Sequence, residues 1–541
     1  MAKNNLIFEI DGKPSIGKLF IFAFQQVLAV LAATILVPTI IGLPVQIPAA
    51  ILGAGLGTLV YLLFTKFKSP VVISSSFAFL GALANAVAFG YMGIILGGIF
   101  AGLVYVIIAL IVKFAGTEWV NKLMPPVIIG PTVALIGLSL AVNATNDIVT
   151  ATADPVNGGY NLVALFCGLV TFFTVVICSV QNRFKAGRLI PFIIGIAAGY
   201  LVASIFTIVG NVANVDYLKI INWDPIIKNF QNITVESFIT YPRFSLIESI
   251  KELVSGEPSV DTVRAFISNN KLTDGVLEII NAGLPEESQI TSIFNANREQ
   301  LWNALVILDK GTPTLISLSP VGIAEVALAF VPVAFVTFAE HIADHKNLST
   351  IVNKELLEDP GLSRTLLGDG VGSMVGTVFG ICPNTTYGES VGCVAITKNA
   401  SVRTIFVAAC MLIVLSFLSP ITAALRTIPN CVMGGVCLTL YGFIAVSGFK
   451  MFQKVDLNNN KNLFIVAAIL ISGIGGLSLQ IPYAIAKNGQ VTNTITITSI
   501  ATALILGIIT MVVCNAIEKL NTPEEQPAEV EEAPAEDKVE E

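Results

Sequence analysis

Two carboxylates and two imidazoles lie together in residues 338–345, at the end of a long apolar run. The stretch reads Phe-Ala-Glu-His-Ile-Ala-Asp-His and holds the only two histidines of the 541-residue chain. Residues 326–339 carry no charge. A helix that continues this run takes Glu340 into hydrocarbon, where an ionisable side chain is costly and marks a functional site.

A helical conformation divides these four side chains between two faces. Glu340 and Asp344 share one face, whereas His341 and His345 share the neighbouring face, turned by roughly 100°. Carboxylates accept hydrogen bonds and can carry protons. We expect the histidines to lie at the membrane interface, where they cap the helix end. Asp344 either does the same or passes protons to Glu340.

The histidine spacing also admits a zinc interpretation. In the zinc-protease motif H-E-x-x-H the general base follows the first histidine, but here Glu340 precedes it and Ile342 takes the base position. No third ligand cluster is present, and the eight cysteines lack CxxC spacing. We expect no bound metal and no enzyme activity, and a membrane metalloenzyme is the weaker alternative.

The composition indicates what must hold these residues in place. With 54% hydrophobic and 12% charged residues, against about 25% charged in soluble domains, the chain is expected to be an integral membrane protein in the lipid bilayer. About fourteen apolar runs are long enough to span it, two of them short and broken.

Basic residues give the orientation. In the short connections Lys and Arg fall in alternate loops, with Arg426 and Lys487 as exceptions. Because basic loops stay on the cytoplasmic side, both termini are expected to be cytosolic in a plasma-membrane protein. The expected divisions are a cytosolic N-terminus (1–15), a first repeat of spans 1–7 (16–210), an extracellular helical insertion (211–319), a second repeat of spans 8–14 (320–520) and a disordered acidic cytosolic tail (521–541).

Seven spans on each side of the insertion predict an inverted repeat, since an odd number reverses the orientation of the second half. Substrates of such transporters lie near the midplane, where interrupted helices end. The interrupted segments here are 74–79 and 382–389. Gln26 precedes Phe77 by nearly as many residues as Glu340 precedes Glu389. Extended backbone at this depth must pair or line a cavity. The alternative is that both segments are surface loops.

Glu340 and Glu389 would then share one cavity. Carboxylates accept N–H donors, and the free N–H groups of a broken helix suit a carbonyl oxygen or an anion. A flat ligand with both kinds of group, such as a pyrimidine or purine base, fits this set, with Phe77, Tyr387 and Tyr441 as candidate aromatic walls. Desolvation and mutual repulsion favour a proton on at least one acid, which makes a proton the natural coupling ion.

At these residues the chain resembles the nucleobase-ascorbate transporter (nucleobase:cation symporter) family, and within it the bacterial uracil permeases. The resemblance covers nearly all spans and leaves out the insertion and the tail. The motifs that carry it are FQQVLAVLAATILVP, SSFAF, AEH with an acid four residues after the glutamate, LEDPGLSRTLLGDG and, most specifically, NTTYGESVGCVAITK.

The resemblance implies an all-α polytopic fold with 14 transmembrane segments in a 7+7 inverted repeat. It implies two short antiparallel strands in broken segments 3 and 10, core and gate domains, and a homodimer. Glu340 and Glu389 would bind the base, and the backbone at Phe77 and Gly388 would contact its carbonyls. The remaining implied positions are Ala33, Tyr387 and Tyr441 in the pocket wall and Asp344 at the proton-coupling position.

Two positions depart from the family pattern. Gln26 replaces a histidine, and Ser390 replaces the usual asparagine. An acid at 389 after Thr-Thr-Tyr is similar to the uracil members. The expected function is therefore proton-coupled uracil uptake by alternating access, with no other cofactor and no nucleic acid partner. The alternatives are a xanthine or purine symporter and, less favoured, an anion exchanger or channel of the same architecture.

Overall fold

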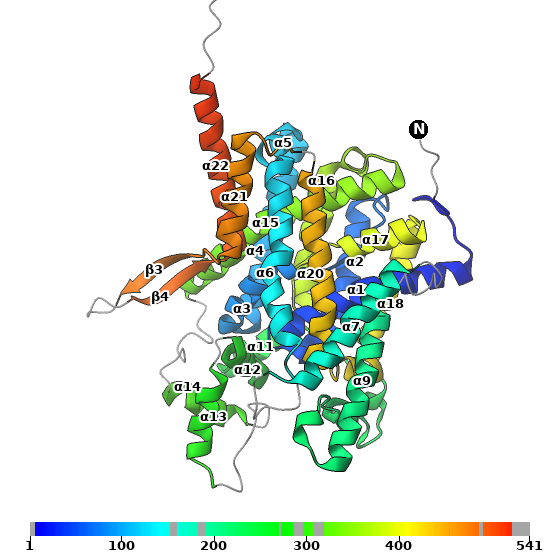
Figure 1. The fold of residues 1–541 in the computed structure, drawn as a ribbon, viewed down its shortest axis with the longest axis vertical. Helices are drawn as coiled ribbons and strands as arrows, with labels where there is room; N and C mark the ends of the chain where they lie inside the picture. The colour runs from blue at the N-terminus through cyan, green and yellow to red at the C-terminus, as the bar shows by residue number, and fades with distance from the viewer. Residues whose placement is uncertain are drawn as a thin grey trace, which may run out of the picture.

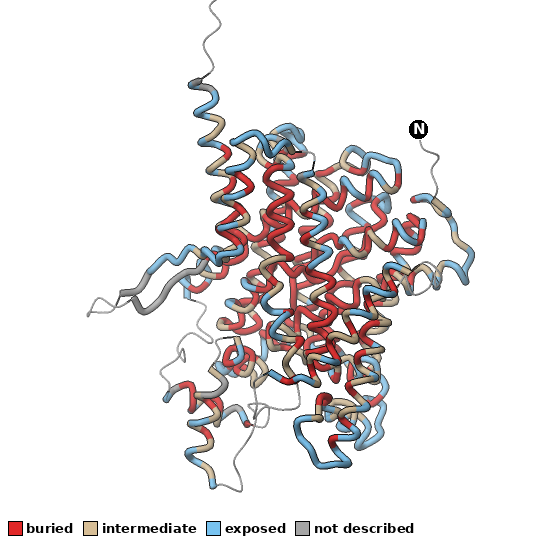
Figure 2. Tube along the Cα trace, in the orientation of Figure 1, coloured by how far each residue is buried: buried red, intermediate tan, exposed pale blue. Residues whose placement is uncertain are grey.

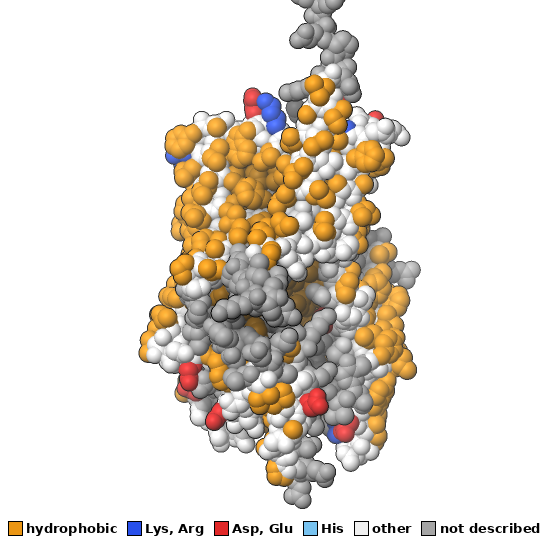
Figure 3. Space-filling model, turned by 90° about the vertical axis from the view of Figure 1, so that its left-hand side faces the viewer, with side chains coloured by type: hydrophobic (Ala, Val, Ile, Leu, Met, Phe, Trp, Pro, Cys, Tyr) orange, Lys and Arg blue, Asp and Glu red, His pale blue; other side chains and the backbone are white. Residues whose placement is uncertain are grey.

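The computed structural model describes residues 6–151, 160–181, 190–269, 272–285, 296–307, 319–453, 455–485 and 491–521. Long apolar helices form one bundle, and short helices cover one of its ends (Figure 1). Among the described residues nine helices are long and apolar enough to cross a membrane. On the face in Figure 3 the charged side chains gather at the two ends of the bundle. The expectation of a multi-pass membrane protein is confirmed.

The first half of the chain supplies one strand and seven longer helices. Pro38 and Pro131 lie inside two of these helices. The elements are α1 (Ile16–Ile40), α2 (Ile47–Phe64), β1 (Ile73–Ser75), α3 (Leu80–Ala86), α4 (Gly90–Ala115), α6 (Pro126–Asp147), α7 (Leu162–Val180) and α9 (Pro191–Ala213), with the short helices η1 (Pro44–Gln46), η2 (Phe77–Phe79), η3 (Val87–Phe89) and α5 (Glu118–Leu123) between them.

The second half begins with the longest helix of the structure, α15 (Pro320–Val352), which carries the Glu340 cluster. The elements after it are α16 (Leu362–Phe379), β2 (Asn384–Thr386), α17 (Gly388–Thr397), α18 (Val402–Ser416), α19 (Ser419–Leu425), α20 (Asn430–Phe452), α21 (Asn460–Ile474), β3 (Leu479–Ile485), β4 (Val491–Ile497) and α22 (Ser499–Asn521).

The helices pack in two groups. The α16 group consists of α1, α2, α4, α15, α16, α17 and α18, and the α6 group consists of α6, α7, α9, α20, α21 and α22. Small residues permit close packing within each group. A Cβ at Gly53 would meet the Gly376 carbonyl in the α16 group, and one at Gly137 would meet the Tyr441 carbonyl in the α6 group. Buried residues concentrate where the two groups meet in the middle of the bundle (Figure 2).

The two broken segments meet as a short antiparallel sheet. β1 pairs with β2 in the register Ile73↔Thr386, Ser74↔Thr385 and Ser75↔Asn384, and the Ser76 amide donates to the Pro383 carbonyl at 3.1 Å. Every residue of both strands is buried. Because each strand completes the hydrogen bonds of the other, extended backbone is tolerated inside the bundle. One strand comes from each half of the chain.

A β-hairpin between α21 and α22 was not expected from the sequence. β3 pairs with β4 antiparallel, and the two strands project sideways from the bundle between α21 and α22 (Figure 1). The signal was present, because Val491-Thr-Asn-Thr-Ile-Thr-Ile is rich in β-branched residues. The expected all-α fold with only two short strands therefore understates the β-structure.

The segment between α9 and α15 covers the end of the bundle opposite to the end of α22 (Figure 1). It contains η4 (Asp216–Leu218), α10 (Asp224–Phe230), η5 (Val235–Ser237), α11 (Ser245–Ser255), α12 (Val260–Asn269), α13 (Thr273–Ala282) and α14 (Arg298–Ile307). This segment is the insertion of the sequence analysis. The acidic tail lies outside the described residues from 522 onward.

Candidate functional site

The paired strands place the starts of two short helices at the centre of the bundle. After β1 the chain forms η2 from Phe77 and then α3, and after β2 it forms α17 from Gly388. A helix start leaves backbone N–H groups without intrahelical partners. Both helix starts therefore bring hydrogen-bond donors to the same buried region.

Glu340 of α15 and Glu389 at the start of α17 lie close to each other beside these helix starts. Both are partly exposed and Gly388 is exposed, whereas Ala339 and Tyr387 beside them are buried. Glu340 lies within electrostatic range of Glu389. Two acids from different helices thus face one site.

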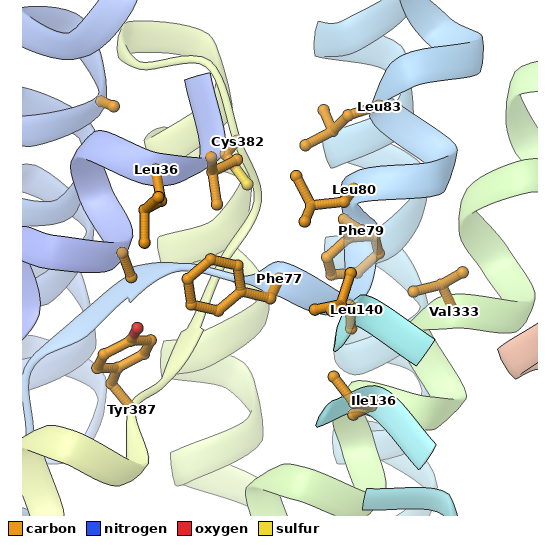
Figure 4. Packing of buried hydrophobic residues seen from close by; sticks show 14 of the residues in the cluster. Leu36, Phe77, Phe79, Leu80, Leu83, Ile136, Leu140, Val333, Cys382 and Tyr387 are labelled. Atoms are coloured by element: carbon orange, nitrogen blue, oxygen red, sulfur yellow. The ribbon is translucent and has the colours of Figure 1, made fainter. Parts of the chain in front are cut away.

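Aromatic side chains flank the strands. The rings of Phe77 and Tyr441 meet edge to face with centroids 5.3 Å apart, and in Figure 4 the Tyr387 ring lies below the strand ribbon on which the Phe77 ring is seen. Within the described residues the Tyr387 hydroxyl and Ser76 Oγ are buried without a hydrogen-bond partner. An unpartnered buried hydroxyl is unfavourable, which indicates that a ligand or water completes this region.

Asp344 lies one turn further along α15 and faces the start of α17. Its Oδ1 is 3.6 Å from the position that a Cβ on Gly388 would occupy, and Thr386 is its other close neighbour. The carboxylate is therefore at the positive end of the α17 dipole. Asp344 is buried at 9% exposure and α15 continues past it to Val352, so the alternative that it caps the helix end is wrong.

The histidines do not cap the helix end either, so that expectation is also wrong. His341 and His345 are 0% and 1% exposed, because α15 continues to Val352 and other helices of the α16 group cover this face. His341 Nδ1 is 2.7 Å from Asp369 Oδ2, and His341 Nε2 is 3.0 Å from Thr365 Oγ1. Asp369 was missed, although it is the only charged residue between Arg364 and Glu389.

His345 completes this buried network. Its Nδ1 lies 2.9 Å from the His341 carbonyl, which only accepts, so Nδ1 carries a proton. Its Nε2 lies 2.8 Å from the Tyr61 hydroxyl. The Tyr61 hydroxyl also lies 2.8 Å from Ser69 Oγ, so it bridges His345 and Ser69. The two imidazole rings stack with centroids 4.1 Å apart. The network locks α15 to α2 and α16.

The two positions that depart from the family pattern contact each other. Ser390 Oγ donates to Gln26 Oε1 at 2.8 Å and accepts from the Val72 amide at 3.0 Å. The contact ties α1 and the start of β1 to α17, one residue after Glu389. Ala33, also in α1, is buried, and the hydroxyl of its neighbour Thr34 lies 2.8 Å from Ser74 Oγ.

The bundle of apolar helices, its largely hydrophobic surface (Figure 3) and the polar site at its centre are typical of a multi-pass membrane transport protein. The model of the permease family, that of the xanthine and uracil permeases, matches residues 17–252 and 310–482. The chain therefore belongs to this family, the nucleobase-ascorbate transporters, as its motifs predicted.

Similar proteins include named uracil permeases. That of Bacillus caldolyticus is 33% identical over 88% of this chain and 90% of its own length. That of Escherichia coli K12 is 30% identical over 98% of each chain. Among solved structures, the transmembrane domain of the cyanobacterial bicarbonate transporter BicA has a TM-score of 0.47 at 13% identity, over 92% of this chain and 97% of that chain.

Proposed function

We propose that the protein imports uracil together with protons across the cell membrane by alternating access. The observation that carries the proposal is that two partly exposed carboxylates, Glu340 and Glu389, lie close to each other beside the helix starts at Phe77 and Gly388. Uracil is flat and carries N–H donors beside carbonyl acceptors. Its N–H groups match the carboxylates, and its carbonyls match the backbone N–H groups. The uracil permeases among the relatives support this choice.

The coupling ion in this proposal is the proton. Glu340, Asp344 and Glu389 are close enough to interact electrostatically, and negative charges repel strongly where the dielectric is low. A bound proton relieves this repulsion and leaves carboxylate oxygens free to accept from the base. We assign to Asp344 the role of receiving and releasing that proton, because it lies between Glu340 and the start of α17.

The architecture that we propose is a pair of inverted seven-span repeats, 16–210 and 320–520, with both termini cytosolic and the insertion 211–319 outside. The α16 group would form the core that holds uracil, and the α6 group would form the gate. The Phe77–Tyr441 contact joins η2, which packs against α15 of the α16 group, to α20 of the α6 group, so movement of the core against the gate would break it. The homodimer implied by the resemblance stays a prediction.

Two other substrates need to be weighed. A xanthine or purine symporter would use the same carboxylates with a larger base. An anion exchanger is less favoured, because the site is lined by Glu340, Asp344 and Glu389 and holds no basic side chain in the described residues. Neither alternative accounts better for the polar groups of the site.

Uptake of labelled uracil into liposomes that contain the purified protein tests the proposal. An inward proton gradient is expected to drive accumulation, and a protonophore is expected to abolish it. Excess unlabelled uracil should compete, whereas xanthine, uric acid and thymine should compete weakly. Strong competition by xanthine would favour the purine alternative, and uptake indifferent to the gradient would rule out proton coupling.

A further inference from the structure

Glu252 of the insertion is a buried carboxylate to which the proposed transport site gives no role. It lies in α11 at 7% exposure. Its Oε2 accepts from the Tyr91 amide at 2.9 Å, and its Oε1 accepts from the Ser259 amide at 3.0 Å and from Thr262 Oγ1 at 2.5 Å. One carboxylate thus joins the start of α4 to the turn between α11 and α12.

The start of α4 is built around this carboxylate. Phe89 is the N-cap residue of α4 and provides no side-chain cap, so a carboxylate from elsewhere is stabilising at the positive helix end. Gly90 adopts a positive φ of 67°, and a Cβ on it would collide with Glu252 Oε2. The Tyr91 side chain is held as well, since Gln46 Nε2 donates to its hydroxyl at 2.8 Å.

This helix start is connected directly to the proposed uracil site. The chain runs from Phe77 through η2, α3 and η3 to Gly90 with no intervening loop. Phe77 and Gly90 therefore lie at the two ends of one continuous series of short helices, and Glu252 contacts the Gly90 end. Movement of the Gly90 end is transmitted to the Phe77 end through a single stack of short helices.

The opposite end of α11 holds the second broken segment. Ser245 Oγ donates to the Gly380 carbonyl, and the Phe244 and Phe379 rings meet edge to face at 6.1 Å. Gly380 follows α16 directly and leads into β2. Figure 1 shows α11 and α12 against the end of the bundle near α3. α11 therefore connects the start of α4 to the end of α16, one from each half of the chain.

We propose that Glu252 is a positioning residue, which fixes the α3–α4 junction and thereby the backbone of Phe77 at the uracil site. This inference rests on the proposed function only for the identity of the substrate. The insertion then acts as a brace on the α16 group. A further tie supports this, because Asn269 Nδ2 donates to the Ile41 carbonyl at the end of α1, at 3.2 Å.

The test compares Glu252→Ala with Glu248→Ala in the full-length protein in detergent. Glu248 is a matched control, because it lies in the same helix at 9% exposure and pairs with Lys251 at 2.7 Å instead of with α4. The main measurement is amide hydrogen exchange over residues 73–79 and 87–95. We expect faster exchange in both segments for Glu252→Ala, wild-type exchange for Glu248→Ala and an intermediate rate for Glu252→Gln, which keeps an acceptor for Tyr91.

Thr262→Val distinguishes a loss of positioning at α4 from a general loss of stability in the insertion. It removes the hydrogen bond from Thr262 to Glu252 within the insertion and leaves the hydrogen bond from the Tyr91 amide to Glu252. It should exchange as the wild type does. Equal exchange at 73–79 in Glu252→Ala and Glu248→Ala, or a Thr262→Val protein that behaves as Glu252→Ala does, would overturn the proposal.

Uracil uptake then measures the consequence for transport. Glu252→Ala should raise KM about five-fold, as expected if the loss of its one hydrogen bond to α4, at the Tyr91 amide, is felt at the uracil site, with Glu248→Ala unchanged. An unchanged KM in Glu252→Ala would overturn the positioning role. A wild-type protein that transports no uracil would refute the proposed function alone, since the exchange measurement needs no substrate.

Discussion

The contact between Ser390 and Gln26 permits a prediction whose size follows from the structure. Ser390 is 0% exposed, and its hydroxyl serves both the Gln26 side chain and the Val72 amide. Ser390→Ala removes both bonds and leaves two buried polar groups with fewer partners. Each such group costs about 1–3 kcal/mol, so we expect a loss of roughly 2–6 kcal/mol around the start of α17.

Part of this loss should appear in uracil affinity, because Ser390 follows Glu389. If one third of the upper value, about 2 kcal/mol, is lost from the free energy of uracil binding, the affinity for uracil falls by about 30-fold. The assay is equilibrium binding of labelled uracil to purified protein, with thermal unfolding as the measure of stability. Ser416→Ala is the matched control, since Ser416 is also fully buried but bonds only to Ile413 of its own helix.

The double substitution Gln26→His/Ser390→Asn sharpens the test. These are the residues of the family pattern, and each single change should weaken uracil binding because it breaks the matched contact. The double variant should bind better than either single variant. Wild-type affinity in Ser390→Ala, or a double variant no better than the singles, would refute the reasoning.

Three further predictions concern the buried groups. His341→Leu and Asp369→Leu should each lower the unfolding temperature, since removing one partner of a buried pair costs about 3–5 kcal/mol. The double variant should lose less stability than the sum of the two single losses, and additive losses would contradict the pairing. Tyr387→Phe should raise KM for uracil about five-fold with unchanged unfolding temperature, if its unpartnered hydroxyl contacts the base; an unchanged KM would exclude that contact. Asp344→Asn should still exchange labelled for unlabelled uracil but fail to accumulate it under a proton gradient; gradient-driven accumulation would remove Asp344 from the coupling step.

Much of the site could be predicted because ionisable residues are costly and therefore rare in membrane spans, so each one that interrupts an apolar run indicates a function. Glu340 and Glu389 interrupt apolar sequence, and the chain around 74–79 and 382–389 is too polar for a plain spanning helix. The structure has β1 at the start of the first segment and β2 within the second, and it brings the two acids close together. The family was predicted from the motifs around the same residues and is confirmed.

The remaining features depend on contacts between distant parts of the chain. Helix periodicity gives the face on which His341 lies but not the helix that covers that face, so the network with Asp369 and Tyr61 was missed. Gln26 and Ser390 are separated by 364 positions, and nothing local in either sequence indicates that they meet. The role of the insertion depends in the same way on Glu252 reaching Tyr91.

The central claim is that Glu340 and Glu389 together bind the base. Equilibrium binding of uracil to Glu389→Gln tests it most directly, because the substitution keeps the shape of the side chain and removes its charge. A hydrogen bond to a charged group contributes about 1.5–3 kcal/mol and one to the neutral amide oxygen of Gln about 0.5–1.5 kcal/mol, so uracil affinity should fall by roughly 5- to 12-fold while the unfolding temperature stays unchanged. Wild-type affinity in this variant would contradict the two-carboxylate site.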